Sequence, residues 1–85
     1  MYILGDIGNT DTKIFLVSKK NKILKRINFI SKKISNNQLK ILFRKNNIQI
    51  NKIEKILFCS VVPNTFKIIK NYFSKITKVK CIEVK

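Results

Sequence analysis

The residue types that can do chemistry gather in one stretch near the amino terminus, Gly5-Asp6-Ile7-Gly8-Asn9-Thr10-Asp11-Thr12-Lys13. Gly8 tolerates positive φ and lets another group approach the backbone closely. Three short polar side chains add hydrogen-bond donors beside the turn amides: Asn9, Thr10 and Thr12. Lys13 offers a point charge to a phosphoryl oxygen, and Asp6 can hold a hydrated Mg²⁺ that bridges phosphates. The combination suits a phosphate-binding site.

The same stretch has a purely structural interpretation. Gly8-Asn9 can simply form a hairpin turn that Thr10 and Asp11 cap, with Lys13 in solvent. Short motifs match by chance, so the residue types alone leave both interpretations open.

Apolar runs on both sides of the stretch must position it. Tyr2-Ile3-Leu4 precedes it and Ile14-Phe15-Leu16-Val17 follows it, which predicts a hairpin from about Tyr2 to Val17. The polar residues then lie at the hairpin tip and not in a core. A polar turn over 18–22, with Asn21 in a left-handed conformation, leads to a third strand over 23–30.

The middle of the chain predicts a helix. Ser35 and Gln38 form a capping box, and Ile34 with Leu39 fits a hydrophobic staple across it. Asn46-Asn47 is a plausible end, because Asn tolerates the left-handed conformation of a helix C-terminus.

The last third predicts a strand, a helix and a strand. The apolar run in 55–63 lacks alternation, which indicates a strand buried on both faces, and Pro63 ends it. Asn64 or Thr65 can cap the helix that follows, whose apolar face is formed by Phe66, Ile69, Phe73 and Ile76. The final strand covers 79–84, and the right-handed crossover makes the two strands parallel. The fold class is therefore α/β, with a mixed sheet in the order β-β-β-α-β-α-β.

Composition limits the function classes. Eighty-five residues make one small domain, and no apolar run approaches the ~20 residues of a membrane span. The strand at the very start leaves no room for a signal segment, so a soluble, intracellular protein is expected. With no His in the sequence, Cys59 and Cys81 lack partners for a zinc site or a thiol nucleophile, and both are expected to be small buried hydrophobes.

The net charge of +15 favours an anionic partner such as nucleic acid. However, 17 of the 19 cations are Lys, and Ile and Asn are also abundant, as AT-rich codon usage produces. The lysines are spread along the chain without an Arg cluster, so nonspecific attraction to polyanions is all that charge predicts.

Two motifs in order carry a family resemblance. Asp6-Ile7-Gly8-Asn9-Thr10, followed by Ser60-Val61-Val62-Pro63, resembles the start of a type III pantothenate kinase. The element order is similar to the opening, ribonuclease H-like half-domain of the acetate and sugar kinase, Hsp70 and actin superfamily.

The resemblance implies ATP-dependent phosphorylation of pantothenate, the first step of coenzyme A synthesis, by a cytoplasmic homodimer that needs Mg²⁺ and K⁺ or NH₄⁺. It implies that the nucleotide phosphates bind Asp6 through Lys13, and that Ser60-Val61-Val62-Pro63 is mainly architecture. Asp11 departs from the Asn that is common in the family, and its carboxylate would weaken phosphate binding unless a metal offsets it.

The family's Gly-x-Asp-Arg segment, which carries the catalytic aspartate and contacts pantothenate, has no match here, nor do the adenine and monovalent-cation ligands. Residues 1–85 are thus expected to be an incomplete amino-terminal half-domain without a second lobe or a catalytic residue, inactive alone. Two alternatives remain: a small basic nucleic-acid-binding module, and a non-catalytic remnant that serves as an interaction domain.

Overall fold

The strands follow the apolar runs of the sequence. In the computed structural model, which describes residues 1–84, three strands form an antiparallel meander: β1 (Tyr2–Ile7), β2 (Asp11–Val17) and β3 (Ile23–Ile30). Asn21, in the turn between β2 and β3, has φ 64° and thus the expected left-handed conformation. The predicted hairpin and third strand are confirmed.

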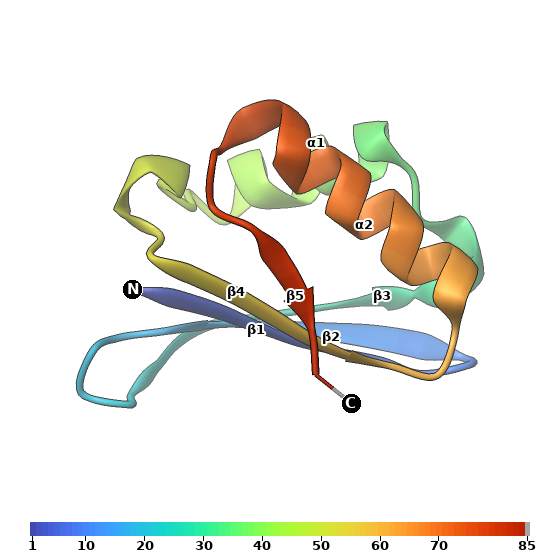
Figure 1. The fold of residues 1–85 in the computed structure, drawn as a ribbon, viewed down its shortest axis with the longest axis horizontal. Helices are drawn as coiled ribbons and strands as arrows, with labels where there is room; N and C mark the ends of the chain where they lie inside the picture. Colours follow the sequence, from blue (N-terminus) through green and yellow to red (C-terminus); the bar gives the residue numbers. More distant parts are fainter. Residues whose placement is uncertain (85) are drawn as a thin grey trace.

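The second half of the chain adds two parallel strands. β4 (Lys55–Ser60) pairs with β1, and β5 (Cys81–Glu83) pairs with β4 after the helix α2 (Pro63–Ile76). The resulting five-stranded mixed sheet has the order β3-β2-β1-β4-β5 (Figure 1). The predicted fold class is confirmed, and the architecture is consistent with a ribonuclease H-like half-domain. Both parallel strands are shorter than predicted, since β4 stops before Pro63 and β5 covers only part of 79–84.

The predicted boundaries of the first helix are also confirmed. The helix α1 (Asn36–Lys45) lies between two 3-10 turns, η1 (Ser31–Lys33) and η2 (Ile50–Lys52). The Ser35 hydroxyl accepts a hydrogen bond from the Gln38 N–H at 3.1 Å and thereby caps the helix. Asn47 has φ 55° just beyond its end.

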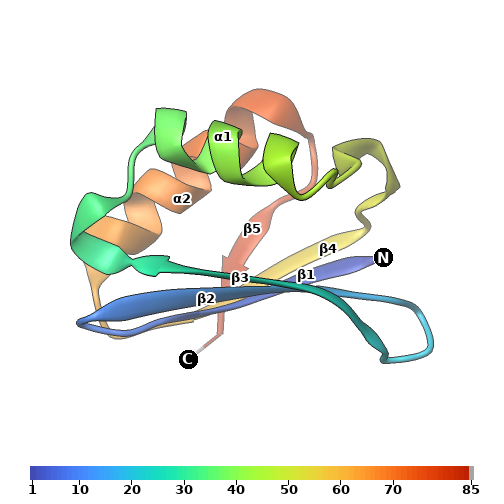
Figure 2. The ribbon, with the colours of Figure 1, turned by 180° about the vertical axis from the view of Figure 1, so that it is seen from behind.

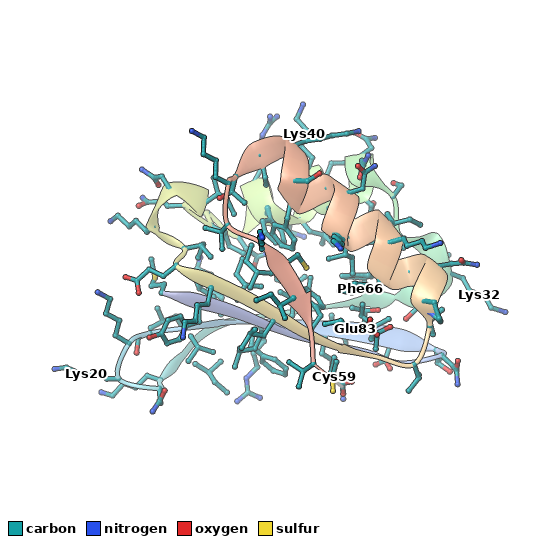
Figure 3. The ribbon with its side chains drawn as sticks, in the orientation of Figure 1. Lys20, Lys32, Lys40, Cys59, Phe66 and Glu83 are labelled. Carbon is teal, nitrogen blue, oxygen red and sulfur yellow. The ribbon has the colours of Figure 1, made fainter. Side chains whose placement is uncertain are left out.

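Both helices cover the same face of the sheet, as Figures 1 and 2 show from opposite sides. The other face, called the open face below, carries no helix within residues 1–84. The expectation that β4 is buried on both faces is therefore wrong: Ile56 and Phe58 are fully buried, whereas Leu57 is half-buried. Cys59 is exposed on the open face (Figure 3) and not buried as expected. Cys81 is buried.

The start of α2 also differs from the prediction. Val62 occupies the N-cap position without a side-chain hydrogen bond, and Asn64 and Thr65 lie inside the helix. The buried face includes Tyr72, whereas Ile76 is 39% exposed near the helix end. The α-helices of residues 1–84 are α1 and α2, and neither is long and apolar enough to span a membrane.

Gly5 is required by the packing between β1 and β4. It lies beside Phe58 in the parallel register, and a Cβ atom at Gly5 would overlap the Phe58 ring. That ring is fully buried and packs against Phe73, with ring centroids 6.2 Å apart. The aromatic core of the domain thus extends over a glycine in the central strand.

We expect Gly5→Ala to lower the free energy of unfolding by about 1–3 kcal/mol, because the added methyl group overpacks the core. Urea denaturation of Gly5→Ala, Phe58→Leu and the double variant measures this cost. Since Leu leaves room for the methyl group, Gly5→Ala should cost less in the Phe58→Leu background; equal costs in both backgrounds would contradict the overlap.

The two thiols should differ in reactivity. Burial raises the pKa of the Cys81 thiol to about 11, so it stays protonated at pH 8, whereas Cys59 is exposed. Iodoacetamide is expected to alkylate Cys59 in the native protein more than about tenfold faster than Cys81, and both at similar rates in denaturant. Mass spectrometry of peptides reports the two rates, and equal native rates would contradict the structure.

Candidate functional site

The connection between β1 and β2 is a tight turn of three residues, Gly8 to Thr10. The Gly8 N–H donates a hydrogen bond to the Asp11 carbonyl oxygen at 2.9 Å. No glycine in the described chain has positive φ, so the expectation that Gly8 supplies that conformation is wrong. Glycine is favoured here because the Asp11 carbonyl group approaches the Gly8 backbone closely. A Cβ atom at Gly8 would lie 3.0 Å from the Asp11 carbonyl oxygen.

Two buried hydroxyl groups hold this turn from inside the protein. The Ser31 hydroxyl donates to the Gly8 carbonyl oxygen at 2.7 Å, and its oxygen lies 2.8 Å from the Thr12 hydroxyl oxygen. The Ser31 N–H donates to the Thr10 carbonyl oxygen at 3.0 Å. Thr12 is fully buried, so its predicted place at the exposed tip is wrong; its hydroxyl supports the turn from beneath.

Sequence reasoning missed Ser31, which lies between the third predicted strand and the first predicted helix. The available signal was its position directly after the third predicted strand. Because Ile30 pairs with Asp11, the next residue lies beside the hairpin turn. A short hydroxyl side chain at that point can reach the turn carbonyls.

Asp6 and Lys13 lie opposite each other on β1 and β2 and share the open face. Directly opposed residues of an antiparallel pair have Cβ atoms about 4.5–5.5 Å apart, so one ligand can reach both side chains. Cys59 on β4 is the other neighbour of Asp6. Both charged side chains are exposed, and within residues 1–84 the ion pairs shorter than 4.0 Å all involve Glu54, which leaves Asp6 and Lys13 free for a ligand.

Asn9 and Thr10 are exposed at the tip itself, and Asp11 is half-buried where β2 begins. The tip borders a cavity of about 470 Å³, which we call the tip cavity. It lies between the hairpin, η1 and the start of α2, at the end of the molecule where Figure 3 labels Lys32. Its lining residues are Asn9, Thr10, Ile30, Ser31, Lys32, Val62 and Thr65.

The predicted site residues thus divide into three groups. Asp6 and Lys13 stand on the open face, and Thr12 lies beneath the turn. The tip is formed by Gly8, Asn9 and Thr10, with Asp11 at its end where β2 begins. An extended anion that crosses the tip can meet turn amides and polar side chains first and the Lys13 ammonium next. Such a site can bind phosphates.

The residues fit a hydrated divalent cation only in part. No three His, Cys, Asp or Glu side chains gather into a metal-binding cluster in the described chain. Mg²⁺, however, is commonly held by one or two carboxylates together with substrate phosphates and water. The exposed Asp6 carboxylate, without an ion-pair partner in residues 1–84, fits that role once phosphates are bound.

Comparisons with known proteins give a consistent result. The model of the type III pantothenate kinase family matches residues 2–85. The chain is 48% identical over 85 residues to the type III pantothenate kinase of Pelagibacter ubique (strain HTCC1062). The match covers 100% of this chain and 34% of that relative, so the chain spans about a third of the relative's length.

Loss of the Ser31 hydroxyl should loosen the turn. Ser31→Ala leaves the Gly8 carbonyl and the Thr12 hydroxyl without a buried partner, which is expected to cost about 1–3 kcal/mol of unfolding free energy. Amide hydrogen exchange should accelerate at Gly8. Ser74→Ala, which removes an exposed helix hydroxyl, is the control and should change stability by less than about 0.5 kcal/mol.

A double-variant cycle isolates the hydroxyl pair. In the Ser31→Ala background the buried Thr12 hydroxyl lacks a hydrogen-bond partner. Thr12→Val removes this hydroxyl and with it the free-energy cost of leaving it unpaired. The double variant should therefore lose less stability than the sum of the single variants, and strict additivity would show that the two hydroxyls do not interact.

Proposed function

The chain belongs to the type III pantothenate kinase family, and we propose that it supplies the ATP phosphate-binding hairpin for the phosphorylation of pantothenate, the first step of coenzyme A synthesis. The observation that supports this most is the placement of Asp6 and Lys13, opposed on one sheet face directly below a tight turn. Kinase chemistry needs a cation on the phosphates and a carboxylate for the metal at nearly the same point, and this pair offers both.

Each hairpin residue has a role in this proposal. The turn around Gly8, Asn9 and Thr10 contacts the phosphate oxygens, and the Lys13 ammonium neutralises part of their charge. Asp6 would hold a hydrated Mg²⁺ on the open face, and the ion would neutralise part of the charge on the phosphates. The carboxylate of Asp11 opposes phosphate binding and makes affinity depend more strongly on the metal.

Turnover requires groups outside this chain. Within residues 1–85 there is no Gly-x-Asp-Arg segment to supply a base and pantothenate contacts. We assign those contacts, the adenine site and the ligands of a monovalent cation (K⁺ or NH₄⁺) to the remaining two thirds of a family member's length. Residues 1–85 accordingly form an incomplete amino-terminal half-domain, and cytoplasmic location and homodimerisation are properties that we propose for the complete protein.

Isothermal titration with ATP, with and without Mg²⁺, tests the hairpin. Lys13→Gln should weaken Mg·ATP binding about tenfold, because a charge-assisted contact is lost. Lys20→Gln, at the exposed turn between β2 and β3, is the matched control for net charge and should have little effect.

Asp6→Asn should act in opposite directions in the two titrations. With Mg²⁺ the variant should bind ATP more weakly, since the metal loses its carboxylate; without Mg²⁺ it should bind at least as well as the natural chain, since a negative charge has gone. Weaker binding in both conditions would contradict a metal role.

Labelled pantothenate should remain unphosphorylated by the chain alone. Turnover that Asp6→Asn abolishes would contradict the proposal that residues 1–85 are an incomplete half-domain.

A further inference from the structure

We propose that the tip cavity is a second anion site, which binds one oxyanion group, phosphoryl or carboxylate, through the start of α2, Thr65 and Lys32. This site lies away from the face that carries Asp6 and Lys13, and Asn9 and Thr10 of the hairpin tip border both. It does not depend on the proposed function, because its ligand needs neither a nucleotide nor a metal.

The first observation is the uncapped start of α2. Val62, the N-cap residue, makes no side-chain cap hydrogen bond, and Pro63 has no N–H. The first intrahelical bond runs from the Phe66 N–H to the Val62 carbonyl oxygen at 3.1 Å. The N–H groups of Asn64 and Thr65 have no partner in residues 1–84, and no acidic residue lies in the first turn. These groups carry the positive end of the helix dipole and favour an anion.

The second observation is the Thr65 side chain. Thr65 is only 5% exposed, and its hydroxyl forms no hydrogen bond with another described residue. Within residues 1–84, the fully enclosed side-chain oxygen without a partner belongs to Asn36, so the Thr65 hydroxyl oxygen keeps some accessible surface. Since Thr65 lines the tip cavity, its hydroxyl opens into that cavity. Burying a hydroxyl group without a hydrogen-bond partner costs free energy, unless a ligand or a water molecule supplies that partner.

The remaining walls fit an anion of modest size. Lys32 adds a positive charge from η1, and Asn9 and Thr10 add polar groups from the hairpin tip. Val62 adds an apolar wall. At about 470 Å³ the cavity holds a phosphate or a carboxylate with a short organic group attached. Donors from three separate elements therefore converge on one cavity.

Titration with inorganic phosphate, followed by ¹⁵N–¹H NMR at constant ionic strength, tests this site. We expect saturable shifts of the Asn64 and Thr65 amides. Constant ionic strength, held with chloride, separates site binding from the general attraction of a chain with a net charge of +15. Parallel titrations with acetate and with Mg·ATP identify the source of the oxyanion that binds most tightly.

Two variants and a control make the test specific. Thr65→Val keeps the shape and removes only the hydroxyl, and it should weaken phosphate binding about tenfold. Lys32→Gln should also weaken it, whereas Lys33→Gln, on the same turn but outside the cavity lining, should not. Unchanged affinity of Thr65→Val, equal effects of the two Lys variants, or shifts that chloride reproduces would overturn the proposal. Failure of Mg·ATP to bind at Lys13 would leave the proposed anion site in the tip cavity intact.

Discussion

The tip of the first hairpin is held by two buried hydroxyl groups. Ser31 bonds to the Gly8 carbonyl oxygen and lies 2.8 Å from the hydroxyl of Thr12, and its own N–H bonds to Thr10. These contacts join the end of β3 to a turn that lies far from it in sequence. Because buried polar groups are costly without partners, the three bonds fix the turn in one position. The position of the turn residues Gly8, Asn9 and Thr10 follows from these contacts.

The two faces of the sheet carry different kinds of side chain. Ile3 and Ile7 of β1 point to the helices and form the core, while the intervening Asp6 points to the open face. On β2 the same alternation buries Thr12 and exposes Lys13. The charged pair therefore shares the open face with half-buried apolar side chains such as Leu4, Phe15 and Leu57. At the end of the sheet, the tip cavity and the start of α2 offer polar groups of another kind.

Local rules predicted much of this fold from the sequence. The Ser35 cap, the left-handed Asn21 and Asn47 and the crossover between β4 and β5 depend on a few neighbouring residues or on chain handedness, and all are confirmed. The family assignment is confirmed as well.

Alternation along a strand defines two faces but does not tell which face the helices cover. The burial of Thr12 and the exposure of Cys59 depend on that choice, so both were predicted wrongly; the support from Ser31 was missed for the same reason.

The central claim is that the hairpin binds the phosphates of a nucleotide. The most direct measurement is an amide-resolved ¹⁵N–¹H NMR titration of the folded chain with Mg·ATP. The account predicts saturable shifts at the amides from Gly8 to Lys13, with much smaller changes in the turn between β2 and β3. A folded protein whose hairpin amides do not move at millimolar Mg·ATP would contradict it, and the family relationship would then describe ancestry alone.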